Sequence, residues 1–166
     1  FNVAVGYNAG QAITTGIKNT IIGGSAGDAL TIGNHNIAIG HKALSTSVDG
    51  DNNTAIGAFA LEDYEDGDGN GHNTAVGSKS QLNATTGEFN TSLGSLSIGS
   101  GVTTGDYNVA VGYNAGQAMT SGLYNVLLGA AAGDAITTAE KNIAIGYGAL
   151  GSEDTHGKNV AIGDSA

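Results

Sequence analysis

The chain repeats one pattern of polar, small and apolar positions ten times. Each copy reads Asn, a β-branched residue, a usually small residue, Val/Ile/Leu and Gly; the first runs from Asn2 to Gly6 and the last from Asn159 to Gly163. Large side chains that alternate with a small one are typical of a strand, because successive side chains of a strand point to opposite sides. The pattern predicts one short strand per copy, with the large pair inside and stacked from copy to copy.

The copies are evenly spaced along the whole chain. The motif Asn recurs at steps of 17, 17, 17, 20, 17, 18, 17, 17 and 17 residues. Such a short period, with β-branched residues and Gly in each unit, is typical of a solenoid. We predict an all-β fold, a parallel β-solenoid of about ten 17-residue coils, in one repeat domain over residues 1–166. A Thr/Ser-rich run later in most coils, such as Ile13 to Gly16, predicts a second, more polar strand.

Two motif positions are predicted to form the corners of each coil. Gly permits positive φ, and Asn tolerates the left-handed region better than most residues. A column of stacked Asn can also form hydrogen bonds from coil to coil. The predicted structural corners are Asn2, Gly6, Asn19, Gly23, Asn36, Gly40, Asn53, Gly57, Asn73, Gly77, Asn90, Gly94, Asn108, Gly112, Asn125, Gly129, Asn142, Gly146, Asn159 and Gly163.

A column of small residues suggests assembly with other copies. Ala or Ser follows each motif Gly by three residues, from Ala9 to Ala166. On the outside of the coils this column would let a neighbouring chain approach closely, so we expect a side-by-side homo-oligomer, a trimer. The alternative, that Ala only fills a tight turn, stays open. Residues 2–18 also match residues 108–124 at 13 of 17 positions, which is typical of duplication within a fibre, and we interpret the chain as a piece of a longer one.

Composition excludes several classes of partner. The chain has 29 Gly, no Pro and no Cys, and its five Lys and 15 acidic residues, without Arg, give a formal net charge of −10. A chain of this sign lacks the basic patch that nucleic-acid binding requires, and it would not be drawn to an anionic membrane. No apolar run approaches the ~20 residues of a membrane span.

The 20-residue coil carries the main candidate metal site, and a weaker echo of it lies one coil earlier, at Asp49 to Asn53. Asp66, Asp68 and Asn70, followed by Gly71, have the spacing with which a Ca²⁺ loop directs oxygen ligands around a sharp turn. The loop lacks the closing Glu of an EF-hand, so Glu62, Glu65 or a neighbouring chain would have to complete it. The alternative is a solvated acidic bulge. We expect no cofactor apart from this candidate Ca²⁺.

Other residues allow weaker alternatives. His35 and His72 both precede a motif Asn, and their copies in a trimer would meet to bind a metal, although the variety of residues at this position favours a turn or rim. Tyr7, Tyr113 and Tyr147 share one position, where they would either stack on sugars or only cover the edge of a coil. No catalytic set surrounds any Ser, Asp or His, so we expect no enzyme. Regular Thr columns on a flat solenoid would allow ice binding, but Ile32, Asp49 and Ala139 interrupt them.

The repeated Asn-x-Ala-Ile/Val-Gly followed by x-x-Ala/Ser resembles the head repeats of trimeric autotransporter adhesins and the repeats of bacteriophage and algal-virus fibre proteins. The resemblance covers essentially the whole chain, although adhesin heads commonly use shorter units. It implies a left-handed parallel β-roll in a non-enzymatic fibre, filament, adhesin or tail-fibre segment. Such a segment would be extracellular, on a cell surface or a virion, and would assemble with itself and attach to a receptor or glycan.

Two alternatives to this interpretation remain. A ligand-binding, carbohydrate-binding or hydrolytic module on the same solenoid is one, and an ice-binding protein is the other. The hexapeptide of left-handed β-helix acyltransferases also resembles Val5 to Gly10, but it occurs here once per coil and not three times.

Overall fold

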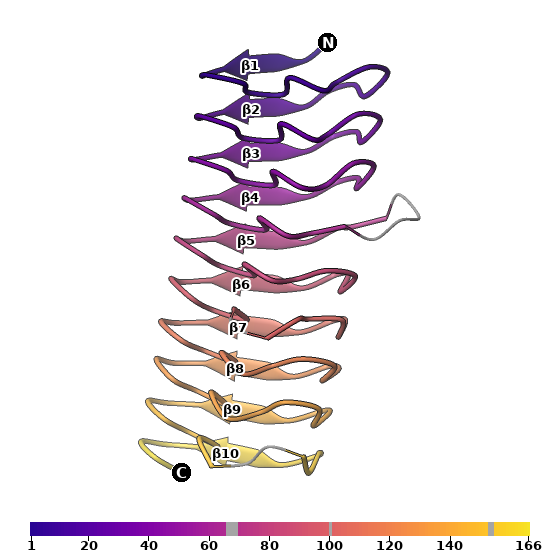
Figure 1. Ribbon diagram of the computed structural model, residues 1–166. Helices are drawn as coiled ribbons and strands as arrows, with labels where there is room; N and C mark the ends of the chain where they lie inside the picture. Colours follow the sequence, from indigo (N-terminus) through magenta and orange to yellow (C-terminus); the bar gives the residue numbers. More distant parts are fainter. Residues whose placement is uncertain (66–69, 100, 153–154) are drawn as a thin grey trace.

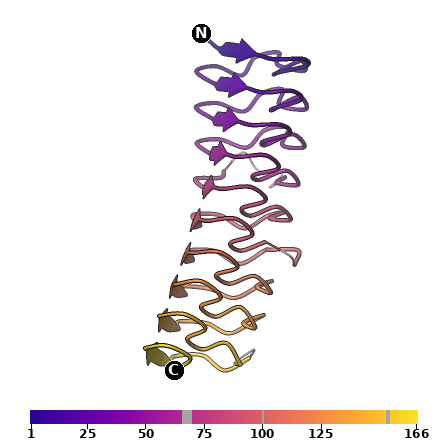
Figure 2. The same ribbon diagram turned by 90° about the vertical axis from the view of Figure 1, so that its left-hand side faces the viewer.

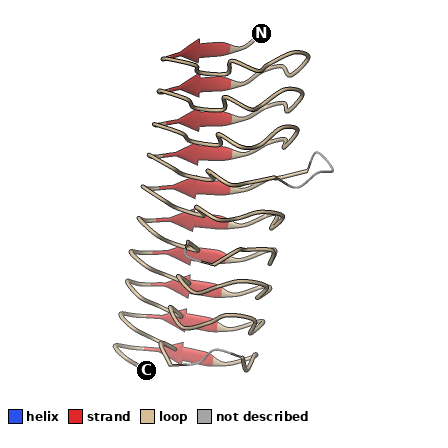
Figure 3. Ribbon diagram, in the orientation of Figure 1, coloured by secondary structure: helices blue, strands red, loops and turns tan. Residues whose placement is uncertain are grey.

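The computed structural model describes residues 1–65, 70–99, 101–152 and 155–166. The described residues form ten strands and no helix, so they include no helix that is long and apolar enough to cross a membrane. Each strand begins directly after a motif Asn and ends directly before a motif Gly. The strands are β1 Val3–Val5, β2 Thr20–Ile22, β3 Ile37–Ile39, β4 Thr54–Ile56, β5 Thr74–Val76, β6 Thr91–Leu93, β7 Val109–Val111, β8 Val126–Leu128, β9 Ile143–Ile145 and β10 Val160–Ile162 (Figures 1 and 3).

All ten strands form one parallel sheet in chain order. Each strand pairs with the next without a shift, so that Ala38 lies beside Ala55. The 20-residue coil keeps this register, because Thr54 still pairs with Thr74, and its additional residues are therefore accommodated in the loop. The coils stack into a rod and rotate gradually along it (Figures 1 and 2). The fold is thus the parallel β-solenoid that the sequence predicts.

The strands face the opposite way from the one predicted. The middle residue of every strand from β2 to β9 points inward and is buried, as Ala38 and Leu127 are, whereas neither flanking residue is buried in any strand. The large pair predicted to lie inside, such as Ile37 and Ile39, therefore lies on the outer side. The interior of each coil is narrow, and larger loop residues occupy much of it. The strand residue that points inward is therefore small in most coils.

The Ala/Ser column also lies inside, which contradicts its predicted place at a chain-to-chain contact. Ala26, Ala132 and Ser80 are fully buried. The backbone N–H of Ala26 donates to the carbonyl of Gly23 at 3.3 Å, and the same turn recurs in the other complete coils. These small residues therefore fill a tight turn, which is the alternative that the sequence left open.

The interior balances large and small residues between the strand and the loop. In β8 the inward residue is Leu127 and the residue six positions later is Gly133; in β4 the pair is Ala55 and Leu61. A Cβ atom on Gly133 would lie 2.7 Å from Leu127 Cδ2, so a large residue at one position excludes a side chain at the other. In these coils the large and the small residue together occupy a similar volume, as close packing requires. In the coil of β7 both positions are small, Ala110 and Gly116, and the loop residue Met119 lies beside Gly116 instead.

The Thr/Ser-rich runs do not form the predicted second strand in the described residues. An isolated parallel bridge joins Ala84 and Thr103. Elsewhere the N–H groups of residues 14–16 all donate to one carbonyl, that of Thr31, at 2.9 to 3.3 Å. Because three donors converge on one acceptor, the runs bond from coil to coil without the evenly spaced hydrogen bonds of a parallel ladder.

Candidate functional site

The most distinctive surface of the molecule is the outer side of the sheet, here called the outward face. It consists of the first and third residues of the ten strands, and every one of them is Val, Ile, Leu or Thr. The first row is Val3, Thr20, Ile37, Thr54, Thr74, Thr91, Val109, Val126, Ile143 and Val160, and the second row is Val5, Ile22, Ile39, Ile56, Val76, Leu93, Val111, Leu128, Ile145 and Ile162.

These apolar side chains are open to solvent. Leu93 is 50% exposed, Ile37 38% and Val160 67%. Ten strands at a spacing of ~4.8 Å make the face about 45 Å long, and all of its strands lie along one side of the rod (Figure 1). A contiguous exposed apolar patch of this length is typical of an interaction surface.

Charged groups lie off the outward face. Lys42 Nζ pairs with Glu62 Oε1 at 3.1 Å, and Lys141 Nζ lies 3.9 Å from Glu140 Oε2; all four residues belong to loops. With a formal charge of −10 carried entirely by other positions, the outward face is a neutral stripe on an acidic rod. Its chemistry suits another apolar surface and offers nothing to a charged ligand.

The motif Asn side chains form a ladder inside one corner. The Oδ1 of each motif Asn accepts a hydrogen bond from the backbone N–H of the next, at 2.8 to 3.1 Å. The Nδ2 of Asn73 also donates to Gly87 O at 2.8 Å, and most other motif Asn residues make the same contact in their own coils. The ladder holds successive strands in register, and in the 17-residue coils it gives each motif Asn side chain a hydrogen-bond partner.

The backbone conformations at the two corners differ from each other. Each motif Gly has φ between 131° and 139°, a conformation in which a side chain is strained. The expectation that the motif Asn is left-handed is wrong, because the positive φ belongs to the residue before it, such as His72 at 56°. The Asn is required for its side-chain hydrogen bonds and not for its backbone.

The predicted Ca²⁺ ligands Asp66 and Asp68 lie outside the described residues, whereas Asn70 is described and exposed. The carboxylates expected to complete the site have other partners, since Glu62 pairs with Lys42 and Glu65 Oε2 accepts from Val48 N–H at 2.9 Å. No group of three or more His, Asp or Glu that could hold a metal occurs in the described part of the chain. The candidate Ca²⁺ site therefore stays a prediction.

The longer coil does interrupt the corner ladder. Asn53 is fully buried, yet its Nδ2 has no hydrogen-bond partner in the described structure. The Asn73 residue of the next coil still bonds to Asn53 Oδ1, at 3.1 Å, the longest distance in the ladder. The departure from the 17-residue period thus leaves one buried donor unsatisfied.

Sequence reasoning missed a stack of four aromatic rings. His72, Phe89, Tyr107 and Tyr124, each directly before a motif Asn, have ring centroids 4.9 to 5.2 Å apart and planes within 7° of parallel. Lys141 Nζ lies 5.9 Å from the Tyr124 centroid and extends the stack as a cation–π contact. The sequence does contain a signal for this stack, namely aromatic residues at the same position of three successive coils. The spacing of stacked strands brings such rings into contact.

The remaining candidates stay apart from one another. Tyr7, Tyr113 and Tyr147 are 81%, 58% and 65% exposed, but even Tyr113 and Tyr147 belong to coils two steps apart, which separates them by about 10 Å. They do not form a continuous sugar-stacking platform. His35 is exposed before the Asn36 coil, and His72 stacks on Phe89.

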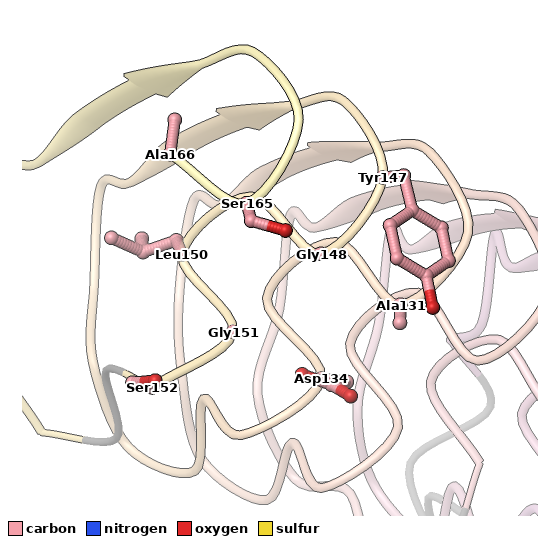
Figure 4. A pocket seen from close by; sticks show the side chains of 9 residues that line it. All are labelled: Ala131, Asp134, Tyr147, Gly148, Leu150, Gly151, Ser152, Ser165 and Ala166. Carbon is pink, nitrogen blue, oxygen red and sulfur yellow. The ribbon is translucent and has the colours of Figure 1, made fainter.

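A hollow lies at the end of the rod that holds β10. It has a volume of about 610 Å³ and is lined by Asp134, Leu150, Ser152, Ser165 and their neighbours (Figure 4). Figure 4 shows the Asp134 carboxylate and the Tyr147 ring on different coils, with Tyr147 at the rim. The described lining contains one carboxylate and several hydroxyls but no His or Lys, and no hydrogen bond among these described residues joins the carboxylate to a hydroxyl.

Comparison of the chain with models of known protein families, with curated proteins and with solved structures finds no match. The fold therefore defines a class, the parallel β-solenoids, and any function must be argued from the surfaces described above.

Proposed function

We propose that the chain is a non-enzymatic structural segment of a fibre or filament, in which copies pack side by side through the outward face. The observation that carries this proposal is a row of twenty uncharged Val, Ile, Leu and Thr side chains, none of them buried, along one side of the rod. Burial of this surface is worth about 25 cal/mol per Å² of apolar area.

Another copy of the same chain is the partner that fits best. A partner for the outward face must be long, straight and repetitive at the strand spacing, and the chain itself has all three properties. Packing these faces together would hide the apolar stripe and leave the acidic loops in water, which favours solubility. We infer a closed ring of copies, because closed symmetric assemblies leave no face unpaired, and we propose three copies because the repeats resemble those of trimeric adhesin heads.

Such a rod would lie outside the cell, on a cell surface or a virion. There it would act as a spacer in the fibre and attach the cell or virion to a receptor or glycan. Support comes from the shape, a rod built of stacked coils, and from the resemblance of its repeats to those of adhesin heads and virus fibres. Surface attachment would then belong to the exposed loops and not to the outward face.

The mass of the protein in solution tests the proposal. We expect the wild-type chain of 16.3 kDa to sediment as three chains. Ile22→Lys and Leu128→Lys place a charge on the outward face and should each return the protein to the mass of one chain, because an unpaired ammonium would be buried on assembly. Thr15→Lys, on an exposed loop, is the matched control and should leave the assembly intact. A wild-type protein that stays at the mass of one chain would contradict the proposal.

Ice binding is a second candidate, because the outward face is exposed, regular and uncharged and carries Thr20, Thr54, Thr74 and Thr91 in its first row. It requires the face to be free in solution, so it excludes assembly through that face. Thermal hysteresis shown by a protein with the mass of one chain, and lost in Thr74→Lys, would favour it over the fibre.

A further inference from the structure

Two columns of residues border the outward face. The leading column is the residue before each motif Asn, and the trailing column is the residue after each motif Gly; in one coil the two are six residues apart, at opposite ends of one strand. Six residues span at most about 20 Å, so both columns lie at the margins of any contact made by the face. Part of the leading column is fixed by the ring stack and by Lys141 at its end.

The symmetry of an assembly decides which columns meet. Rotation about an axis parallel to the rod brings the leading column of one copy to the trailing column of the next, at the same height, because a closed rotation contains no translation. Rotation about an axis perpendicular to the rod instead brings leading column to leading column, with the order of the coils reversed.

The residues in the two columns are complementary in the first arrangement. The exposed Lys158 meets the partner's Asp164, which is also exposed, and these are opposite charges. Lys141 meets the partner's Tyr147, 65% exposed, whose ring can take a cation on its face. The large Phe89 ring meets the partner's Ser95, which leaves room for it.

The second arrangement is unfavourable at the same positions. With the coils in reverse order and the rods fully overlapped, Lys18 of the second coil meets the partner's Lys141 in the ninth, and two of the five Lys residues oppose each other. Like charges brought together at an interface weaken it and exclude the wrong partner or orientation.

We infer that copies assemble around an axis parallel to the rod, and that the seam between leading and trailing columns fixes their register through Lys158 with the partner's Asp164, Lys141 with the partner's Tyr147 and Phe89 with the partner's Ser95. This inference rests on the proposed self-assembly through the outward face. The apolar stripe supplies affinity that is nearly the same in every register, since all its coils are alike. The seam differs from coil to coil and therefore supplies specificity.

Crosslinking tests the seam, because the chain contains no Cys and each introduced pair is unambiguous. In Phe89→Cys/Ser95→Cys, a short thiol-to-thiol reagent should join chains into covalent rings seen on a denaturing gel. The controls are Phe89→Cys alone and the shifted pair Phe89→Cys/Ser78→Cys, in which the second thiol lies one coil earlier. Neither control should link.

Charge reversal gives an independent measurement. Lys158→Glu and Asp164→Lys should each raise the dissociation constant of the assembly about tenfold, and the double variant should restore it to within about threefold. Linked chains with Phe89→Cys alone, linkage of the shifted pair, or an assembled protein without linkage of the matched pair would each overturn the inference while leaving self-assembly intact. A wild-type mass of one chain would overturn both.

Discussion

In β2 and β8 the two sides of the strand carry the same kind of apolar residue in opposite surroundings. In β2, Ile21 is fully buried and its neighbour Ile22 is 38% exposed, and in β8 Leu127 is fully buried whereas Leu128 lies on the outward face. Hydrophobicity alone does not separate the two sides. The inner side has mostly Ala, which a large loop residue accompanies in most coils, while the outer side has Val, Ile, Leu and Thr with no counterpart in the chain.

This difference shows which residues the fold itself requires. An inner residue is fixed by its coil: where the strand has Leu127, the loop must have Gly133, and where the strand has Ala55, the loop has Leu61. An outer residue has no such constraint from its own chain, since water would accept Lys or Glu there. The uncharged Val, Ile, Leu and Thr of the outward face are therefore best explained by a contact outside the chain.

The sharpest test of the comparison uses adjacent leucines of β8. Leu127→Ala should lower the free energy of unfolding by about 3 kcal/mol, because it removes a buried side chain opposite a Gly that cannot fill the cavity. Leu128→Ala should cost under about 1 kcal/mol, because its side chain is already partly in water. Urea titration should be done at a dilution where wild-type protein has the mass of one chain. Equal costs would show that the two sides are not distinct.

Buried and exposed amide side chains should also differ in how much they stabilise the fold. Asn108→Ala should lower the free energy of unfolding by about 2 to 3 kcal/mol, because Asn125 N–H loses the Oδ1 that it bonds at 2.9 Å and Gly122 O loses its Nδ2 donor at 2.8 Å, all in the interior. Gln11→Ala removes an exposed amide of similar chemistry and should change stability by less than about 0.5 kcal/mol. A loss as small for Asn108 would show that the ladder contributes little.

The period and the class of fold were readable from the sequence because they depend on local rules. Corner Gly residues with φ near 135° and a strand pattern between them recur at a fixed spacing, and this is sufficient to predict a parallel solenoid. The direction in which the strands face was not readable by the same argument. Alternation shows that Ile37 and Ala38 point to opposite sides, but it does not say which side is the interior.

The missing information lies in the loops. A large residue such as Leu44 six positions after Ala38, and Gly27 six positions after Ile21, shows that the middle strand residue shares a small space with the loop. Comparing these positions between coils would have identified the inner side. The aromatic stack was similarly visible only when the same position was compared across coils.

Exchanging the small strand residue and the large loop residue of one coil tests directly whether the two side chains share a fixed volume. Ala55→Leu alone should cost about 2 kcal/mol by overpacking, and Leu61→Gly alone about 3 kcal/mol by leaving a cavity. The double variant copies the Leu127 and Gly133 arrangement and should be more stable than the sum predicts by about 2 kcal/mol. Because Leu61 already has a φ of 50°, Gly can take its place without backbone strain. Strict additivity of the two costs would refute the proposed balance.

A cluster of polar side chains interrupts the apolar interior near the middle of the rod. Gln81 is fully buried, its Nε2 donates to Ser92 Oγ at 2.9 Å and to Thr74 O at 3.1 Å, and its Oε1 has no partner in the described structure. Ser92 Oγ in turn lies 2.5 Å from Ser80 Oγ. This polar group separates an apolar cluster that ends at Ala84 from one that begins at Ile98.

Replacing this polar cluster should change the free energy of unfolding less than the other variants do, and should raise it. Gln81→Leu gives the coil of β5 the pair that β4 has in Ala55 and Leu61, because the strand residue six positions before Gln81 is already Ala75, and Ser92→Ala gives β6 the inner Ala of most other strands. Leu tolerates the positive φ at position 81 because Leu61 has it already. Removing an unpaired buried carbonyl should raise the free energy of unfolding by about 1 kcal/mol, since Ser80 keeps its bond to Ser97 at 3.1 Å. Gln81→Leu alone is the matched control and should gain less, because Ser92 loses its amide donor. A double variant that is less stable than wild type in urea titration would contradict this prediction. It would show that Gln81 Oε1 has a partner such as a buried water, and that the inner side of the strands tolerates polar groups as well as the outer side does.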